Sequence, residues 1–292
     1  MIGKIPAGIL LATAVLANTA QAQSLLDRPP NLSGDWVANL GTVQFNFLHR
    51  FVRSAPPIRK VSNYPTFLMG MGLPSHFMLG FQYATNSTLA PRYPNEWEFF
   101  ARWHPLNESE EAPLDLGVQL AYNLAAEGVD GELSLAKRVG PARLIGVGRV
   151  LADPYQSGST RFAIGGGGTL RLLRWLAIAG DYTTIMNRDT ARGERAAWSV
   201  GVHLVIPNTP HSLSIQMTNT NTSTMQGSSR GDTQRRYGFE FTIPISLARY
   251  FGRSSSSPPR ASPPAPRAPP PPGPPGARPP AALGSGAGAP PP

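Results

Sequence analysis

The central part of this chain alternates between apolar and polar or small residues, with a period of two, over segments of about ten residues. In residues 114–124 one face carries Leu114, Leu116, Val118, Leu120, Tyr122 and Leu124, and the other carries Asp115, Gly117, Gln119, Ala121 and Asn123. Successive side chains of a β-strand point to opposite faces of the sheet, so this alternation predicts strands with one strongly apolar face. The pattern recurs in residues 77–83, 97–104, 198–206, 213–218 and 237–245.

The pattern predicts about twelve strands, an even number, as single-chain bacterial outer-membrane barrels have. The predicted strands are residues 43–53, 66–72, 76–85, 96–105, 114–124, 131–139, 142–152, 161–171, 175–186, 197–206, 211–219 and 236–246. Two of them fit the pattern less well. Gly70 and Gly72 interrupt 66–72, and 142–152 alternates poorly.

A soluble β-sandwich also has alternating strands, but three features favour a membrane barrel. The strands exceed the roughly five to six residues typical of globular sheets. Aromatic residues recur near strand ends, as interfacial girdles do; they are Tyr83, Trp97, Trp103, Tyr122, Trp175, Tyr182, Trp198 and Tyr237. Charged residues make up 15% of the chain, against roughly 25% in soluble domains. We therefore predict an all-β fold, a closed antiparallel transmembrane β-barrel of residues 43–252 in contact with outer-membrane lipid.

The connections between predicted strands fall into two groups. With both barrel ends in the periplasm, the periplasmic turns are mostly tight, and the external loops are mostly longer. The external loops include residues 54–65, 86–95, 153–160, 187–196 and 220–235.

The two ends of the chain differ from the centre. Residues 1–22 have the pattern of a secretory signal peptide, with Lys4, a short apolar run and an Ala20-Gln21-Ala22 cleavage site. A membrane anchor is the alternative, but the apolar run is too short to span a bilayer. We expect residues 23–42 to form an N-terminal periplasmic segment. Residues 253–292 contain sixteen of the 32 prolines, which predicts a disordered Pro-rich tail in the periplasm that could bind a periplasmic protein partner.

Composition excludes several classes of function. About half of the net charge of +9 lies near the two ends, on Lys4, Arg253, Arg260, Arg267 and Arg278, so the charge does not indicate nucleic-acid binding. The chain has no cysteine, and its five histidines lack metal-ligand spacing. The sequence does not supply a nucleophile, a base and an orienting group together. We predict no enzyme activity, no catalytic residue, no cofactor and no metal.

The polar faces of the strands give a set of candidate lumen-lining residues. They are Arg50, Glu96, Glu98, Arg102, Asp115, Gln119, Asn123, Glu132, Arg138, Arg161, Arg171, Asp181, His203, Gln216 and Glu240. Their charges nearly balance, which argues against a strongly ion-selective pore. Barrels of eight strands are filled and those of sixteen are open, so either an ion-pair network or a polar conduit is compatible with twelve.

The first strand also carries a resemblance to a known family. Residues 43–51, ending in His49-Arg50-Phe51, and the following segment 67–72 resemble the opening of an uncharacterised bacterial outer-membrane β-barrel family. That family usually continues with Gly, where this chain has Val52. The resemblance covers about residues 34–251. It implies the barrel fold and an outer membrane of the Gram-negative type, and it supplies no catalytic residues.

Two hypotheses of function follow. The polar inner face suggests a porin-like channel or transport component for small polar solutes. The alternative is a structural or docking barrel whose Pro-rich tail holds a periplasmic partner.

Overall fold

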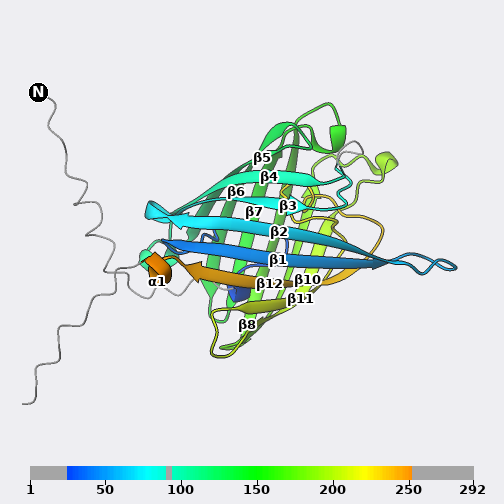
Figure 1. Ribbon diagram of the computed structural model, residues 1–292. Helices are drawn as coiled ribbons and strands as arrows, with labels where there is room; N and C mark the ends of the chain where they lie inside the picture. The colour runs from blue at the N-terminus through cyan, green and yellow to red at the C-terminus, as the bar shows by residue number, and fades with distance from the viewer. Residues whose placement is uncertain (1–24, 90–93, 252–292) are drawn as a thin grey trace, which may run out of the picture. The chain divides into compact units, whose positions relative to one another are not determined.

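The computed structural model describes residues 25–89 and 94–251, and their main feature is a set of twelve β-strands (Figure 1). The strands are β1 (Thr42–Arg53), β2 (Val61–Leu73), β3 (Phe77–Ala84), β4 (Glu96–Leu106), β5 (Asp115–Asn123), β6 (Gly128–Val139), β7 (Ala142–Leu151), β8 (Arg161–Leu173), β9 (Leu176–Ile185), β10 (Ala197–Val205), β11 (Ser212–Thr218) and β12 (Arg236–Ser246). Each predicted strand corresponds to one of these.

The strands form a closed barrel in which every strand pairs antiparallel with its sequence neighbour and β1 pairs with β12. In the closing pair, Phe47 lies opposite Phe241 and Val43 lies opposite Ile245. Closure leaves no sheet edge with unpaired backbone groups, which is the condition for crossing lipid with strands. The predicted all-β fold, a closed antiparallel barrel of twelve strands, is confirmed within the described residues.

The second strand is longer than predicted. It begins at Val61, so part of the predicted external loop 54–65 belongs to β2. Pro65 lacks an N–H, but it sits in the ladder opposite His49, and its carbonyl oxygen accepts a bond of 3.0 Å from the Thr85 N–H. One proline therefore does not end the strand here.

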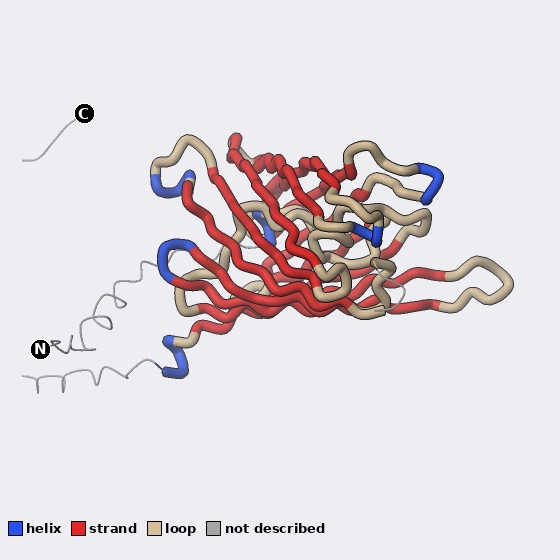
Figure 2. Tube along the Cα trace, turned by 90° about the horizontal axis from the view of Figure 1, so that it is seen from above, coloured by secondary structure: helices blue, strands red, loops and turns tan. Residues whose placement is uncertain are grey.

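Short helices and connections lie at both ends of the strands (Figure 2). We call the end where β1 begins and β12 ends the inner end. It carries η3 (Pro74–His76), η4 (Glu108–Glu110) and α1 (Ala248–Phe251). The outer end carries η5 (Pro154–Gln156), η6 (Thr190–Arg192) and the longer connections. None of the described residues forms a helix long and apolar enough to span a bilayer.

Two segments outside the strands lie inside the barrel wall. The first, residues 25–39, includes η2 (Leu25–Asp27) and is called the N-terminal segment below. We expected residues 23–42 to form an N-terminal periplasmic segment, which stays a prediction; the part described, from Leu25, is mostly buried among lumen-facing side chains. The reason is that its apolar residues, such as Leu32 and Trp36, pack against apolar positions on the inner wall.

The second internal segment is the connection between β11 and β12. Residues 219–231, called the β11–β12 loop below, are nearly all buried, whereas residues 220–235 were predicted as an external loop. Their hydroxyl and amide groups bond to charged side chains of the inner wall, and these bonds hold the loop inside the barrel. The predicted signal peptide, residues 1–22, and the whole of the predicted tail, residues 253–292, lie outside the described residues.

Candidate functional site: a polar lumen closed by two segments

The lumen wall is the candidate site, and the structure buries most of the predicted lumen residues inside it. The buried ones are Arg50, Glu96, Glu98, Arg102, Asp115, Gln119, Asn123, Glu132, Asp181, His203, Gln216 and Glu240. Arg138 and Arg171 lie at the inner end and Arg161 at the outer end, and all three are partly exposed. The polar face therefore extends from one end of the barrel to the other.

The N-terminal segment crosses the lumen and contacts strands on opposite sides. The Asn31 N–H donates to Asp181 Oδ2 at 2.9 Å, and Arg50 Nη2 donates to Asn31 Oδ1 at 2.6 Å. Asp181 lies in β9 and Arg50 in β1. Further along, Arg28 bonds Glu240 of β12 and Arg102 of β4 donates to Ser33 Oγ at 2.7 Å. Contacts with so many strands fix the segment in the lumen.

A compact ion cluster anchors the middle of the N-terminal segment. Asp35 lies near His104 and Asp115, and their ligating atoms fall within 4.8 Å of one another, a grouping that could hold a metal ion. However, Arg143 Nη2 already donates to Asp35 at 2.6 Å and to Asp115 at 2.7 Å. Its guanidinium places a positive charge between the two carboxylates, so an ion-pair network occupies the place that a metal ion would take.

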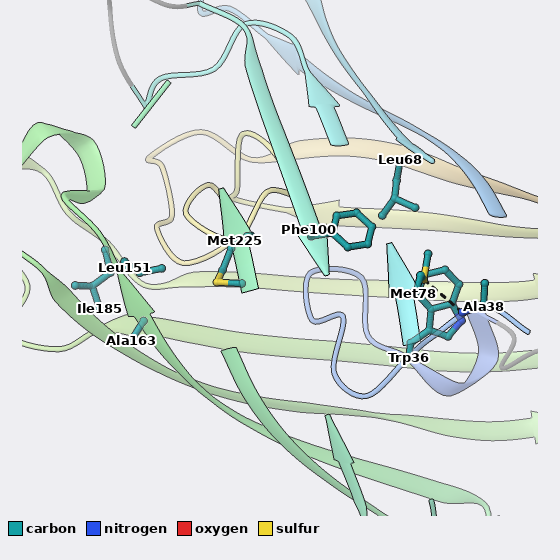
Figure 3. Packing of buried hydrophobic residues seen from close by; sticks show 10 residues of the cluster. Trp36, Ala38, Leu68, Met78, Phe100, Leu151, Ala163, Ile185 and Met225 are labelled. Atoms are coloured by element: carbon teal, nitrogen blue, oxygen red, sulfur yellow. Dashed lines mark hydrogen bonds between the residues drawn. The ribbon is translucent and has the colours of Figure 1, made fainter. Parts of the chain in front are cut away.

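Apolar contacts complete the seat of the N-terminal segment. Trp36 packs with Leu68, Met78 and Phe100 of the inner wall, and the Ala38 N–H donates to Met78 Sδ at 3.3 Å (Figure 3). The Arg28 and Arg102 guanidinium carbons lie 5.5 Å and 5.6 Å from the Trp36 ring centroid, within cation–π range. Leu32 packs with Ala136, Ile145 and Val147 in a second cluster.

The β11–β12 loop is held mainly by an acidic part of the wall. Thr224 Oγ1 donates to Glu96 at 3.0 Å, the Met225 N–H donates to Glu98 at 2.7 Å, and Gln226 Nε2 donates to Asp130 at 3.0 Å. These carboxylates come from β4 and β6, on the far side of the lumen from β11 and β12. The loop thus spans the outer half of the barrel.

Two buried arginines hold both internal segments at once. Arg50 donates to Asn31 of the N-terminal segment and, through Nη1, to Thr220 Oγ1 and the Thr222 carbonyl, both at 2.7 Å. Arg149 of β7 pairs with Glu132 at 2.6 Å and donates to Ser228 and Ser229 at 3.0 Å and 2.9 Å. Its Nη2 also reaches the Asn31 carbonyl at 3.5 Å.

Little space remains between the two segments. A cavity of about 30 Å³ is lined by Arg28, Pro30, Asn31, Ser33, Trp36, Asn46, Leu48, Thr66, Leu68, Gln82, Arg102, Ser223 and Glu240. That volume accommodates about one water molecule. Among the described residues, this cavity between the segments has no room for a solute larger than water.

Several lumen residues were missed from the sequence, most notably Arg143 and Arg149 of β7. This strand alternates poorly because its inward positions include Ile145 and Val147. Those side chains are apolar because they contact Leu32 rather than water. The inward charges at Arg143 and Arg149 could have been found by continuing the period of two through the strand.

His203 and Ser214 are direct cross-strand neighbours on β10 and β11, and both are fully buried. Neither side chain has a hydrogen-bond partner among the protein atoms. The pair is therefore not arranged as a nucleophile hydrogen-bonded to its base.

Outside the strands, two carboxyl groups have lowered pKa values. At the inner end, the Lys137 ammonium, 2.6 Å from Glu108, and the Arg138 N–H lower the pKa of Glu108 below its ordinary value. At the outer end, burial acts to raise the pKa of Asp232, but bonds from Arg236 and Thr233 lower it below the ordinary 3.8.

The outer surface of the barrel is apolar. Leu79, Phe99, Leu120, Leu133 and Ile215 are all more than two-fifths exposed. Aromatic rings gather near the strand ends: Phe77 stacks on Trp103 toward the inner end, with ring centroids 5.3 Å apart, and Tyr83 packs on Trp97 toward the outer end, at 4.6 Å. A closed barrel with this exterior matches the membrane-spanning type. The chain is a β-barrel of the membrane-spanning type.

Comparisons with known proteins give only distant likenesses. No family model and no curated protein matches the sequence. Among solved structures, the KdgM porin in complex with disordered oligogalacturonate has 9% identity and a TM-score of 0.45, covering 70% of this chain and 99% of its own. The NanC porin has 10% identity and a TM-score of 0.45, covering 70% and 100%. The COG4313 outer membrane channel from Pseudomonas putida F1 has 14% identity and a TM-score of 0.42, covering 72% and 97%.

Proposed function

We propose that this protein is an outer-membrane channel for small polar solutes that the N-terminal segment and the β11–β12 loop hold closed. The supporting observation is that a polar wall runs the length of the barrel and is blocked by two segments that are not part of the strand ladder. The N-terminal segment precedes β1 and joins the wall at Gly41, whose N–H bonds the Gly72 carbonyl at 3.0 Å. It can leave the lumen without breaking any of the twelve strand pairs.

The contacts that hold the segments are mostly charged hydrogen bonds. Water and a polar solute can replace such bonds when a segment leaves, so breaking each bond costs only its net contribution, about 1.5–3 kcal/mol for a bond to a charged group, rather than its full strength. A lumen filled by apolar packing throughout would lack this property. The distribution of contacts therefore favours a closed channel over a permanently filled barrel.

Planar-bilayer conductance tests this function. Four forms of the protein are compared: the full chain, a deletion of residues 25–39, a form in which residues 220–230 are replaced by a short Gly-Ser linker, and the double variant. Because the two segments block the lumen in series, we expect the double variant to conduct most and the full chain least.

A second candidate function, a structural or docking barrel, is supported by the filled lumen itself. If the double variant folds, shown by β-rich circular dichroism and a heat-dependent gel shift, and still does not conduct, the channel proposal is wrong and the structural barrel is favoured. The role of the tail is then tested by comparing co-purified periplasmic proteins with and without residues 253–292. We propose no catalytic activity under either candidate function.

A further inference from the structure

Three arginines from consecutive strands surround Asp27 at the inner end of the barrel. Arg138 of β6 and Arg171 of β8 both donate to Asp27 Oδ1, at 2.7 Å and 2.8 Å. Arg143 of β7 donates through Nη1 to the main-chain carbonyl oxygen of Asp27, at 2.9 Å. Asp27 of the N-terminal segment thus accepts hydrogen bonds from three guanidinium groups.

The site is open to solution on one side and fixed on the other. The side chains of Arg138 and Arg171 are 41% and 36% exposed, whereas that of Arg143 is 3% exposed. Asp115 of β5 bonds the other terminal nitrogen of Arg143 and thereby orients its Nη1 toward Asp27. A ligand arriving at the inner end can reach the two exposed arginines and find the third already positioned.

Departure of the N-terminal segment would leave this site with excess positive charge. Asp27 and Asp35 both belong to the segment and would leave together. Among the described carboxylates that bond these three guanidinium groups, Asp115 alone belongs to the wall. Glu108, which accepts from the Arg138 backbone N–H, is paired with Lys137.

The geometry of Asp27 indicates which anion fits. Its carboxylate carbon and its main-chain carbonyl carbon are the two ends of a four-carbon chain, and the arginines bond oxygens at both ends. That arrangement of oxygens is the one a four-carbon dicarboxylate such as succinate presents. A monocarboxylate offers oxygens at one end only, and the oxygens of inorganic phosphate all lie on one atom, so neither ligand presents oxygens at the two ends of a carbon chain.

We propose that Arg138, Arg143 and Arg171 form a binding site for a small four-carbon dicarboxylate, and that Asp27 fills this site in the closed barrel as an internal substitute. Binding of the dicarboxylate does not depend on the proposed channel function. Its role as a transported solute or as an opening signal rests on that function. Binding at the site excludes Asp27, so the ligand shifts the population toward the displaced segment.

Calorimetric titration of the detergent-solubilised protein tests the site without any conductance. In Asp27→Asn the competing carboxylate is absent, so succinate should bind about tenfold tighter than in the unsubstituted chain, or better. Adding Arg171→Gln to Asp27→Asn should weaken succinate binding by about tenfold or more. Arg174→Gln, an exposed arginine in the turn after β8, is the matched control and should have no effect.

Butyrate and inorganic phosphate are the comparison ligands at equal ionic strength. The proposal is overturned if either binds as tightly as succinate, which would indicate general anion attraction, or if Arg174→Gln weakens binding as much as Arg171→Gln does. Absence of succinate binding to folded Asp27→Asn would overturn it as well.

Displacement of the N-terminal segment by succinate is measured separately, in a protein that retains Asp27. The protein has no cysteine, so Ala38→Cys places one thiol at a buried position of the N-terminal segment. Succinate should accelerate maleimide labelling of this thiol, and butyrate should not. Failure here or in the titration, alongside a conducting double variant, would reject the dicarboxylate site and leave the channel standing. Succinate binding by a double variant that does not conduct would reject the channel instead.

Discussion

Gly117 of β5 shows how closely the N-terminal segment approaches the wall. A Cβ built on this glycine would lie 2.5 Å from the Asp35 Cα atom and 2.5 Å from Ser134 Oγ. Backbone atoms cannot approach a Cβ that closely, so the segment can take its present position only if residue 117 is glycine.

We therefore expect Gly117→Ala to displace the segment while the barrel still folds. The measurement is maleimide labelling of Ala38→Cys, which should become several-fold faster, with Ser159→Cys in an exposed outer connection as the reference for unhindered labelling. Gly146→Ala is the matched control, because its added Cβ meets no atom within 4 Å. Equal labelling rates in the two alanine variants would contradict this account of Gly117.

Asp232 gives a prediction about pH at the same scale. Its pKa is lower in the folded protein than the ordinary 3.8, mainly because Arg236 and Thr233 bond the carboxylate against the opposing effect of burial. A group with a depressed folded pKa stabilises the fold above its unfolded pKa, and this contribution is lost as the pH falls through the folded pKa.

Asp232→Asn should therefore lower the heat-unfolding midpoint in detergent at pH 6, and the difference from the unsubstituted chain should shrink below about pH 4. Asp189→Asn, at another acidic position in an outer connection, shows whether loss of any outer carboxylate has this effect. A difference that stays constant from pH 6 to pH 3 would be inconsistent with the Asp232–Arg236 pair as its source.

At the scale of elements, β7 and the N-terminal segment pack against each other through apolar side chains. Leu32 is fully buried against Ile145 and Val147 of β7 and Ala136 of β6. Replacing a buried leucine by alanine typically costs about 2–5 kcal/mol. Here the loss falls on the seating of the segment, because the strand ladder between β6 and β7 does not involve Leu32.

Leu32→Ala should thus accelerate labelling of Ala38→Cys and leave the unfolding midpoint of the barrel nearly unchanged. Leu40→Ala is the control, since Leu40 is exposed at the end of the segment. A large fall in the barrel midpoint with unchanged labelling would mean that Leu32 supports the wall rather than the seating of the segment.

At the scale of the whole molecule, the two internal segments are coupled through shared partners. Arg50 of β1 forms hydrogen bonds with both segments, and so does Arg149 of β7. Loss of one segment leaves each of these buried guanidinium groups with fewer acceptors, which weakens its hold on the other segment.

Arg50→Met should accordingly accelerate labelling at Ala38→Cys and also at Ser228→Cys, a buried position in the β11–β12 loop. Leu32→Ala, which removes apolar contacts of the N-terminal segment only, should accelerate labelling of Ala38→Cys more than labelling of Ser228→Cys. Faster labelling at one site alone in Arg50→Met would show that the two segments move independently.

The alternating pattern of the strands is enough to predict the barrel. Alternation is a local property, since each strand needs one apolar and one polar face, and lipid then requires that the twelve strands close. Residues such as Arg50, Glu98 and Asp181 could be placed on the inner face for the same reason. The same period of two places Arg143 and Arg149 of β7 on the inner face, but the apolar Ile145 and Val147 between them made the alternation hard to recognise.

What fills the lumen could be seen only in the folded protein. The contacts that close it join residues far apart in the chain: Arg143 and Asp35 are separated by 108 positions, and Arg50 and Thr220 by 170. Neither the N-terminal segment nor the β11–β12 loop has a periodic pattern, because each is positioned by individual bonds to many strands rather than by a repeating ladder. A local pattern can state that a side chain faces inward, but the partner it meets there is known only once the barrel has closed around it.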